Sequence, residues 1–226
     1  MECIHAAALR AGRDPESVRL VVVTKGQKVE RLRQAVGAGA NRLGENYVEE
    51  ALDKMVQLEQ HVEVEWHMIG HIQSRKARLV AEKFDFVHSL DSTKLAVRLD
   101  RFSEEAHRRL PVLLECNVSG EGSKFGFPAW ETESWHALAA AARQITDLPN
   151  LSVQGLMTMP PYFDDPEDAR PYFQRLVRLR DFLCQQFPQR SWSELSMGMS
   201  GDYEIAVQEG ATLLRVGQAI MGLRPE

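Results

Sequence analysis

Cysteine is scarce in this sequence, and its spacing excludes two classes of site. The three cysteines, Cys3, Cys116 and Cys184, are odd in number and far apart, and no CxxC pair occurs. This pattern predicts neither a disulfide framework nor a zinc knuckle. It is typical of a protein in a reducing compartment, and we therefore expect a cytoplasmic protein.

Long apolar runs and blocks of like charge are also missing. No run approaches the roughly 20 apolar residues that a membrane helix needs, and the first residues carry Glu2 where a signal peptide carries positive charge. The net charge is -5, and no basic stripe is present to neutralise a phosphate backbone. We expect neither a membrane nor a nucleic acid as a partner.

The rest of the composition is that of an ordinary folded protein. Apolar residues make up 44% and charged residues 26% of the 226 residues, which is enough to bury a sizeable core. Because α/β barrels commonly occupy about 250 residues as one unit, the length predicts a single domain over residues 1–226. With no evident second domain or coiled-coil seam, we expect a monomer.

The chain alternates between short apolar runs and segments of helical periodicity. Residues 20–23 read Leu-Val-Val-Val, which is typical of a strand buried on both faces in a parallel sheet. Leu95, Leu99 and Phe102 exemplify the helical spacing between such runs. Eight strand–helix units can close into a (β/α)8 barrel, and an open doubly wound sheet is the alternative, because periodicity cannot show closure. The seven further runs, two of them weak, lie at residues 42–44, 65–69, 84–90, 111–118, 151–157, 194–197 and 212–217.

Lys25 is the first candidate for chemistry, because it follows the first apolar run directly. It therefore lies at the carboxyl end of a strand, the face where barrels place their sites. Between Val22, Val23 and the barrel wall, desolvation would lower the pKa of the Lys25 ammonium and favour the neutral amine that a Schiff base needs. The alternative is a lysine that reaches solvent at a strand mouth, and position alone favours that alternative.

The last quarter of the chain supplies a charge and two candidates for anion binding. Strand alternation puts Arg215 on the same face as Leu213 and Gly217, so it is aimed into the barrel if that face is inward. Gly217 begins the last turn, and Ser200 precedes a short helical segment after the strand before it. Barrels often bind phosphate at these two places. The alternatives are a packing glycine and a helix cap.

Other patterns give weaker signals. His67 and His71 are four residues apart, but the pattern lacks a carboxylate and a third ligand, so we expect a structural role and not a metal site. The glycine-broken loop at residues 117–127 matches neither GxGxxG nor a Walker loop. No GxSxG nucleophile elbow occurs.

Eight motifs, in matching order along the chain, carry a resemblance to one family. They are VVTK at 22–25, LGENY at 43–47, WHMIGHIQS at 66–74, HSLDS at 88–92, NVSGEGSKFGF at 117–127, GLMTM at 155–159, SMGMS at 196–200 and RVGQAIMG at 215–222. From about Pro15 to Arg224 the chain resembles the YggS/PROSC family of pyridoxal 5'-phosphate (PLP) homeostasis proteins.

This resemblance implies a barrel similar to the amino-terminal domain of alanine racemase, with PLP held as a Schiff base on Lys25. It also implies that Arg215 faces the pyridine nitrogen and that Ser200, Gly217 and the adjacent turn hold the phosphate. Gln218 stands where the family usually has threonine, so its amide or only the backbone would reach the phosphate. Four further residues match positions that line the cofactor cavity in the family: Asn46, His67, Ser89 and Met157.

The implied function is PLP binding and intracellular PLP homeostasis, with PLP-dependent apoenzymes as candidate recipients. A guanidinium can donate to the pyridine nitrogen but cannot take a proton from it, so a ring held by Arg215 is a poor stabiliser of carbanions. Racemisation also needs a second proton donor, which alanine racemase takes from another domain and subunit. We therefore expect a carrier and not an enzyme. The alternatives are a PLP-dependent amino-acid racemase of low activity and a barrel that binds another phosphorylated ligand.

Overall fold

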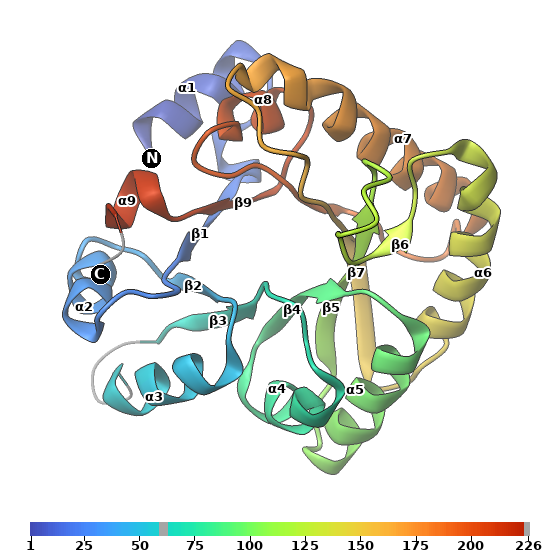
Figure 1. The fold of residues 1–226 in the computed structure, drawn as a ribbon, viewed down its shortest axis with the longest axis horizontal. Coiled ribbons are helices and arrows are strands. Elements are labelled where there is room, and N and C mark those ends of the chain that lie inside the picture. The colour runs from blue at the N-terminus through green and yellow to red at the C-terminus, as the bar shows by residue number, and fades with distance from the viewer. Residues whose placement is uncertain (59–62, 224–226) are drawn as a thin grey trace.

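The computed structural model describes residues 1–58 and 63–223. In this part of the chain, eight parallel strands form a closed barrel inside a ring of helices (Figure 1). Strand β9 pairs with β1, and β4 pairs with β5, which closes the sheet. The predicted (β/α)8 barrel is confirmed and the open sheet is excluded. The barrel strands are β1 (Arg19–Val23), β2 (Arg42–Glu45), β3 (Glu65–Met68), β4 (Phe86–Leu90), β5 (Leu110–Asn117), β7 (Leu151–Met157), β8 (Glu194–Ser196) and β9 (Leu213–Val216).

One short strand was not predicted. Strand β6 (Phe127–Pro128) pairs in parallel with the end of β5 and ends the loop at residues 117–127. Two residues are too few to show a periodicity, so the sequence pattern gave no signal for it. The expected ends of the resemblance at Arg224 and of the single domain at Glu226 lie outside the described residues.

The longer helices of the outer ring each bury an apolar stripe. In α5, Leu95, Ala96 and Leu99 are buried at helical spacing, and the Ser92 hydroxyl accepts a hydrogen bond from the Leu95 N–H at 3.3 Å as an N-cap. No helix among the described residues is long and apolar enough to cross a bilayer. The helices are α1 (Glu2–Arg10), α2 (Val29–Gly37), α3 (Val48–Leu58), α4 (Ala77–Lys83), α5 (Thr93–Glu105), α6 (Trp135–Thr146), α7 (Arg170–Gln186), α8 (Tyr203–Gln208) and α9 (Gln218–Met221).

The inside of the barrel holds an apolar cluster to which five strands each contribute one side chain. Its members are Val21, Phe86, Leu113, Met157 and Leu213. Because side chains alternate along a strand, the inward position of Leu213 also sends Arg215 to the inner face. The inner-face position predicted for Arg215 is therefore confirmed.

A glycine allows the turn after β8 to pack closely against a neighbouring helix. Gly198, just after β8, has a φ of +93°, and a Cβ there would lie 2.6 Å from the Ala206 Cβ. Glycine adopts this left-handed backbone without steric cost. It lets the turn that carries Ser200 pack directly against α8.

Candidate functional site

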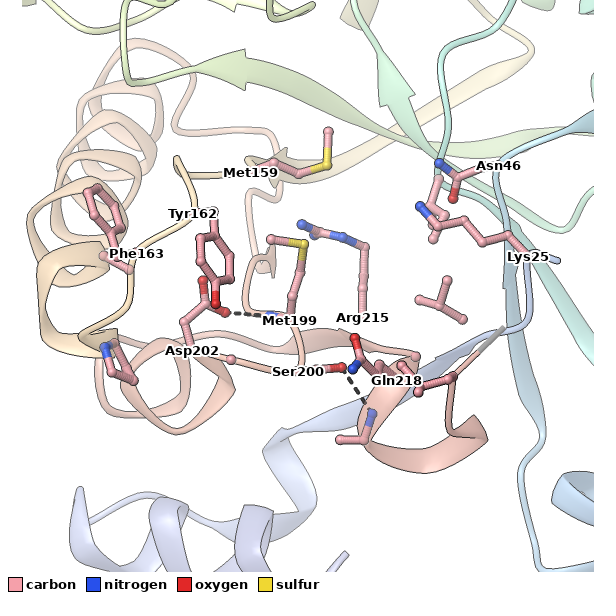
Figure 2. A pocket seen from close by; sticks show the side chains of 18 of the residues that line it. Lys25, Asn46, Met159, Tyr162, Phe163, Met199, Ser200, Asp202, Arg215 and Gln218 are labelled. Carbon is pink, nitrogen blue, oxygen red and sulfur yellow. Dashed lines mark hydrogen bonds between the residues drawn. The ribbon is translucent and has the colours of Figure 1, made fainter. Parts of the chain in front are cut away.

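A cavity of about 880 Å³ opens at the carboxyl ends of the barrel strands (Figure 2). Its walls come from the turns that follow β1, β2, β3, β7, β8 and β9. Because β1 pairs with β9, barrel closure places the first turn of the chain beside the last. Six of the nine predicted site residues line the cavity: Lys25, Asn46, Ser200, Arg215, Gly217 and Gln218.

Lys25 lies in the turn directly after β1 and is half-buried. Figure 2 shows its side chain pointing toward Asn46 across one wall of the cavity. Asn46 follows β2, whose backbone pairs with β1 at Val23 and Gly44.

Arg215 is a buried cation in the wall of the cavity. One terminal nitrogen donates to the Ser196 hydroxyl at 2.5 Å, and the other donates to the Thr158 carbonyl at 2.8 Å. Burial lowers the pKa of Arg215 to about 10, so its guanidinium is still protonated at neutral pH. A guanidinium has five N–H donors, and these two bonds leave donors for a ligand.

A hydrogen-bonded series of buried side chains supports Arg215 from the barrel interior. Ser196 Oγ lies 2.8 Å from His88 Nδ1, and His88 Nε2 lies 2.8 Å from His67 Nδ1. The Ser196 hydroxyl accepts from Arg215 and keeps a second lone pair and its own O–H, so it can donate to His88 or accept from it. His67 Nε2 faces Glu65 Oε1 at 3.5 Å. The directions of the bonds from Ser196 to His88 and from His88 to His67 therefore depend on which ring nitrogens carry hydrogen.

His88 gives the protein a pH-dependent stability of known sign. Burial, with the nearby charges of His67 and Arg215, lowers the pKa of His88 well below its ordinary value. The unfolded chain takes up this proton as the pH falls below about 6.5 and the native state does not, so stability is lost toward acid by at most about 1.4 kcal/mol per pH unit. We expect His88→Gln to remove this contribution, which urea unfolding between pH 5 and pH 7.5 would measure.

A second buried group, Glu115, changes the free energy of unfolding with pH in the opposite direction. It must therefore be present in both proteins that are compared. Burial and the nearby charge of Asp91 raise the pKa of Glu115 to about 7, against the opposing charge of Arg215. The native state therefore holds a proton that the unfolded chain releases, and stability falls as the pH rises from about 4.5 to about 7. The informative quantity is the slope of the free energy of unfolding against pH, compared between His88→Gln and the unmodified protein. Equal slopes would contradict a neutral His88.

The turns after β8 and β9 form the other end of the cavity. Ser200 Oγ accepts a hydrogen bond from the Ala219 N–H at 3.3 Å, which ties the two turns together. Asp202, and not Ser200, is the N-cap residue of α8, so the alternative of a simple helix cap for Ser200 is wrong. Figure 2 shows Ser200 and Gln218 at the same edge of the cavity. The first N–H groups of a helix lack partners within it, and both short helices begin beside this edge.

Three predicted site residues lie elsewhere in the structure. His67, Ser89 and Met157 are buried, and within the described chain they are not part of the cavity lining. The Ser89 hydroxyl donates to the Gly70 carbonyl at 2.6 Å, and Met157 belongs to the inner apolar cluster. Strand alternation and packing decide that these side chains do not reach the cavity lining, and a family motif in the sequence does not show either.

The cavity also contains residues that the sequence analysis missed. Gln27 follows Lys25 by two residues and lines the same cavity, so its position in the turn was an available signal. Within the described residues, Gln27 Oε1 and Asn46 Oδ1 are buried without a hydrogen-bond partner. Such amide groups are normally paired, and they offer polar contacts to a ligand. Residues from the β7 and β8 turns complete the wall, among them Met159, Tyr162, Phe163, Met199 and Asp202.

Comparisons with known proteins identify the family of this chain. The family described as alanine racemase, N-terminal domain, matches residues 6–225. A pyridoxal phosphate homeostasis protein of Vibrio alginolyticus is 43% identical over 218 residues, covering 95% of this chain and 90% of the relative. The one of Escherichia coli is 38% identical over 227 residues, covering 98% and 92%.

Solved structures show the same relationship. PipY of Synechococcus elongatus with PLP bound is 35% identical and has a TM-score of 0.84, covering 98% of this chain and 100% of PipY. An alanine racemase of Clostridium difficile is 12% identical with a TM-score of 0.69, covers 100% of this chain and 56% of its own, and shows the fold alone. The chain therefore belongs to the family of pyridoxal phosphate homeostasis proteins, which share the barrel of the alanine racemase N-terminal domain.

Proposed function

We propose that this protein binds PLP in the cavity at the carboxyl ends of its barrel strands, with Lys25 as the point of covalent attachment. Its role is intracellular PLP homeostasis in the cytoplasm, without robust turnover, and PLP-dependent apoenzymes are the recipients. One observation carries the proposal: Lys25, Arg215 and the turns at Ser200 and Gly217 line one cavity of about 880 Å³. The names of the relatives and the PLP-bound PipY structure support it.

The residues present fit each part of the cofactor. When bound, PLP supplies an aldehyde that condenses with a primary amine, a pyridine ring and a phosphate. Lys25 offers the amine, and Arg215 offers donors to the ring nitrogen. Ser200, Gly217 and Gln218 lie where hydroxyl, backbone and amide donors can hold the phosphate. Asn46 completes the set with an amide whose buried oxygen has no hydrogen-bond partner among the described residues.

The bonds of Arg215 support a carrier and not an efficient catalyst. Arg215 keeps its proton at neutral pH, and it is the donor in its hydrogen bonds to Ser196 and Thr158. It can hold a ring nitrogen by donation, but it cannot stabilise that nitrogen in the protonated form that carbanion chemistry favours. We therefore expect no amino-acid racemisation at an enzyme-like rate. A chiral assay across small amino acids tests this, and turnover above about 1 s⁻¹ would contradict the proposal.

The direct test of the function is an absorbance spectrum with and without borohydride. After incubation with PLP, the protein should be yellow, and reduction should shift the absorbance and fix the label. Peptide mapping should then find the label on Lys25. A protein that stays colourless after incubation binds a different ligand, and a label on another lysine would overturn the attachment site.

Ser200→Ala should weaken the binding of PLP without weakening that of pyridoxal, which has no phosphate. A hydrogen bond to a charged group contributes about 1.5–3 kcal/mol, so we expect a loss of roughly tenfold to a hundredfold in PLP affinity. Absorbance titrations with both compounds measure the ratio. Gln218→Ala in the same titrations tests its side chain, since a backbone-only contact predicts an unchanged ratio. An equal loss for both compounds in Ser200→Ala would contradict the phosphate assignment.

A further inference from the structure

A buried ionic cluster lies behind the turn that carries Lys25. Lys54, on α3, is 4% exposed. Its Nζ lies 2.6 Å from Glu45 Oε1 at the end of β2 and 2.6 Å from Glu50 Oε1, one helical turn earlier on α3. The same ammonium donates to the Thr24 carbonyl at 2.6 Å. Lys54 therefore joins the ends of two strands and a helix at one point.

This cluster holds the backbone on both sides of Lys25. On one side, Thr24 is bound through its carbonyl to Lys54, and its hydroxyl donates to Glu45 Oε1 at 2.6 Å. On the other side, the Gly26 N–H donates to Glu50 Oε1 at 2.5 Å. Gly26 has a φ of +68°, so the chain turns sharply there. The neighbours of Lys25 in sequence are thus fixed to the same three charged residues.

Fold stability is a weak explanation for such a cluster. Removing charges from water is unfavourable, and buried ion pairs can often be replaced by apolar residues with no loss of stability. Burial raises the pKa of Glu45, while hydrogen bonds from Lys54 and Thr24 oppose that shift. Among the described residues, the side-chain hydrogen bonds from the cluster to other residues end on Thr24 and Gly26, which points to a role in placing residue 25.

We propose that Lys54, Glu45 and Glu50 are positioning residues that clamp the Lys25 turn, so that the Lys25 amine meets a carbonyl in a reactive geometry. This inference rests on the proposed function, because it names what orients the attaching amine. A misplacement of about 1 Å can reduce the rate of a reaction by a hundredfold. The clamp therefore acts on the rate at which the covalent link forms.

The sharpest test uses neighbouring glutamates of α3. Glu50→Ala removes the acceptor for the Gly26 N–H, whereas Glu50→Gln keeps an acceptor oxygen. Glu49→Ala serves as the control, because it removes only a surface ion pair with Lys76. In Glu50→Ala we expect hydrogen exchange at the Gly26 amide to quicken by about tenfold or more, as for a lost bond to a charged group. The rate of borohydride-trapped PLP labelling at Lys25 should fall by a similar factor. Glu50→Gln should restore most of both quantities, and Glu49→Ala should change neither.

Each result decides the proposal. Unchanged exchange at Gly26 in Glu50→Ala would overturn the clamp, and so would faster exchange with an unchanged labelling rate, because the turn would then not position the amine. The exchange measurement needs no PLP. If the unmodified protein labels another lysine, the proposed attachment site fails, while the Gly26 exchange rates still test the clamp. The double variant Glu45→Gln/Lys54→Met leaves no buried charge at those two positions and should slow labelling as Glu50→Ala does.

Discussion

Lys25→Ala should reduce the borohydride-fixed PLP label to background and abolish the retention of PLP through gel filtration. The expectation follows from the position of Lys25, which is half-buried in the cavity between the β1 turn and Asn46. Without this amine, PLP has only non-covalent contacts with Arg215 and the phosphate-binding turns. Absorbance and mass spectrometry of the reduced protein measure the loss.

The matched control for this experiment lies three residues further along the chain. Lys28 is an exposed lysine at the start of α2 and is not part of the cavity lining in the described residues. We expect Lys28→Ala to keep the label and the retention of the unmodified protein. If Lys25→Ala retains PLP as well as Lys28→Ala does, the covalent site lies elsewhere and the proposed function loses its main support.

Arg215→Met should weaken PLP binding by about tenfold to a hundredfold, because it removes a charged donor from the cavity wall. It should also lower the free energy of unfolding by about 1–3 kcal/mol, since the Thr158 carbonyl and the Ser196 hydroxyl lose a buried partner. Absorbance titration gives the affinity, and urea unfolding gives the stability. The two effects are measured on the same preparation.

A second arginine separates binding from stability in this comparison. Arg175, on α7, donates to the Val118 carbonyl at 2.6 Å and does not line the cavity in the described chain. Arg175→Met should therefore destabilise the fold without reducing PLP affinity. A variant Arg215→Met that binds PLP as tightly as Arg175→Met does would show that the guanidinium makes no contact with the cofactor.

Local patterns in the sequence were sufficient to predict the barrel strands and one end of the site. The Leu-Val-Val-Val run ends at residue 23, so the carboxyl-end position of Lys25 follows from the length of the run alone. The alternation in residues 213–217 likewise placed Arg215 with Leu213, and the structure has both inside the barrel. These predictions held because strand periodicity acts over a few neighbouring residues.

Contacts between distant segments decided the rest. His88 and Ser196 are 108 residues apart and Lys54 and Thr24 are 30 apart, so no local pattern indicates that they form hydrogen bonds. Barrel closure also decided that His67, Ser89 and Met157 lie outside the cavity lining while Gln27 lies within it. The sequence by itself indicated the family, the eight barrel strands and six of the residues that line the cavity. Only the tertiary structure decided which of those residues meet, because hydrogen bonding and packing depend on distances between segments that periodicity does not constrain.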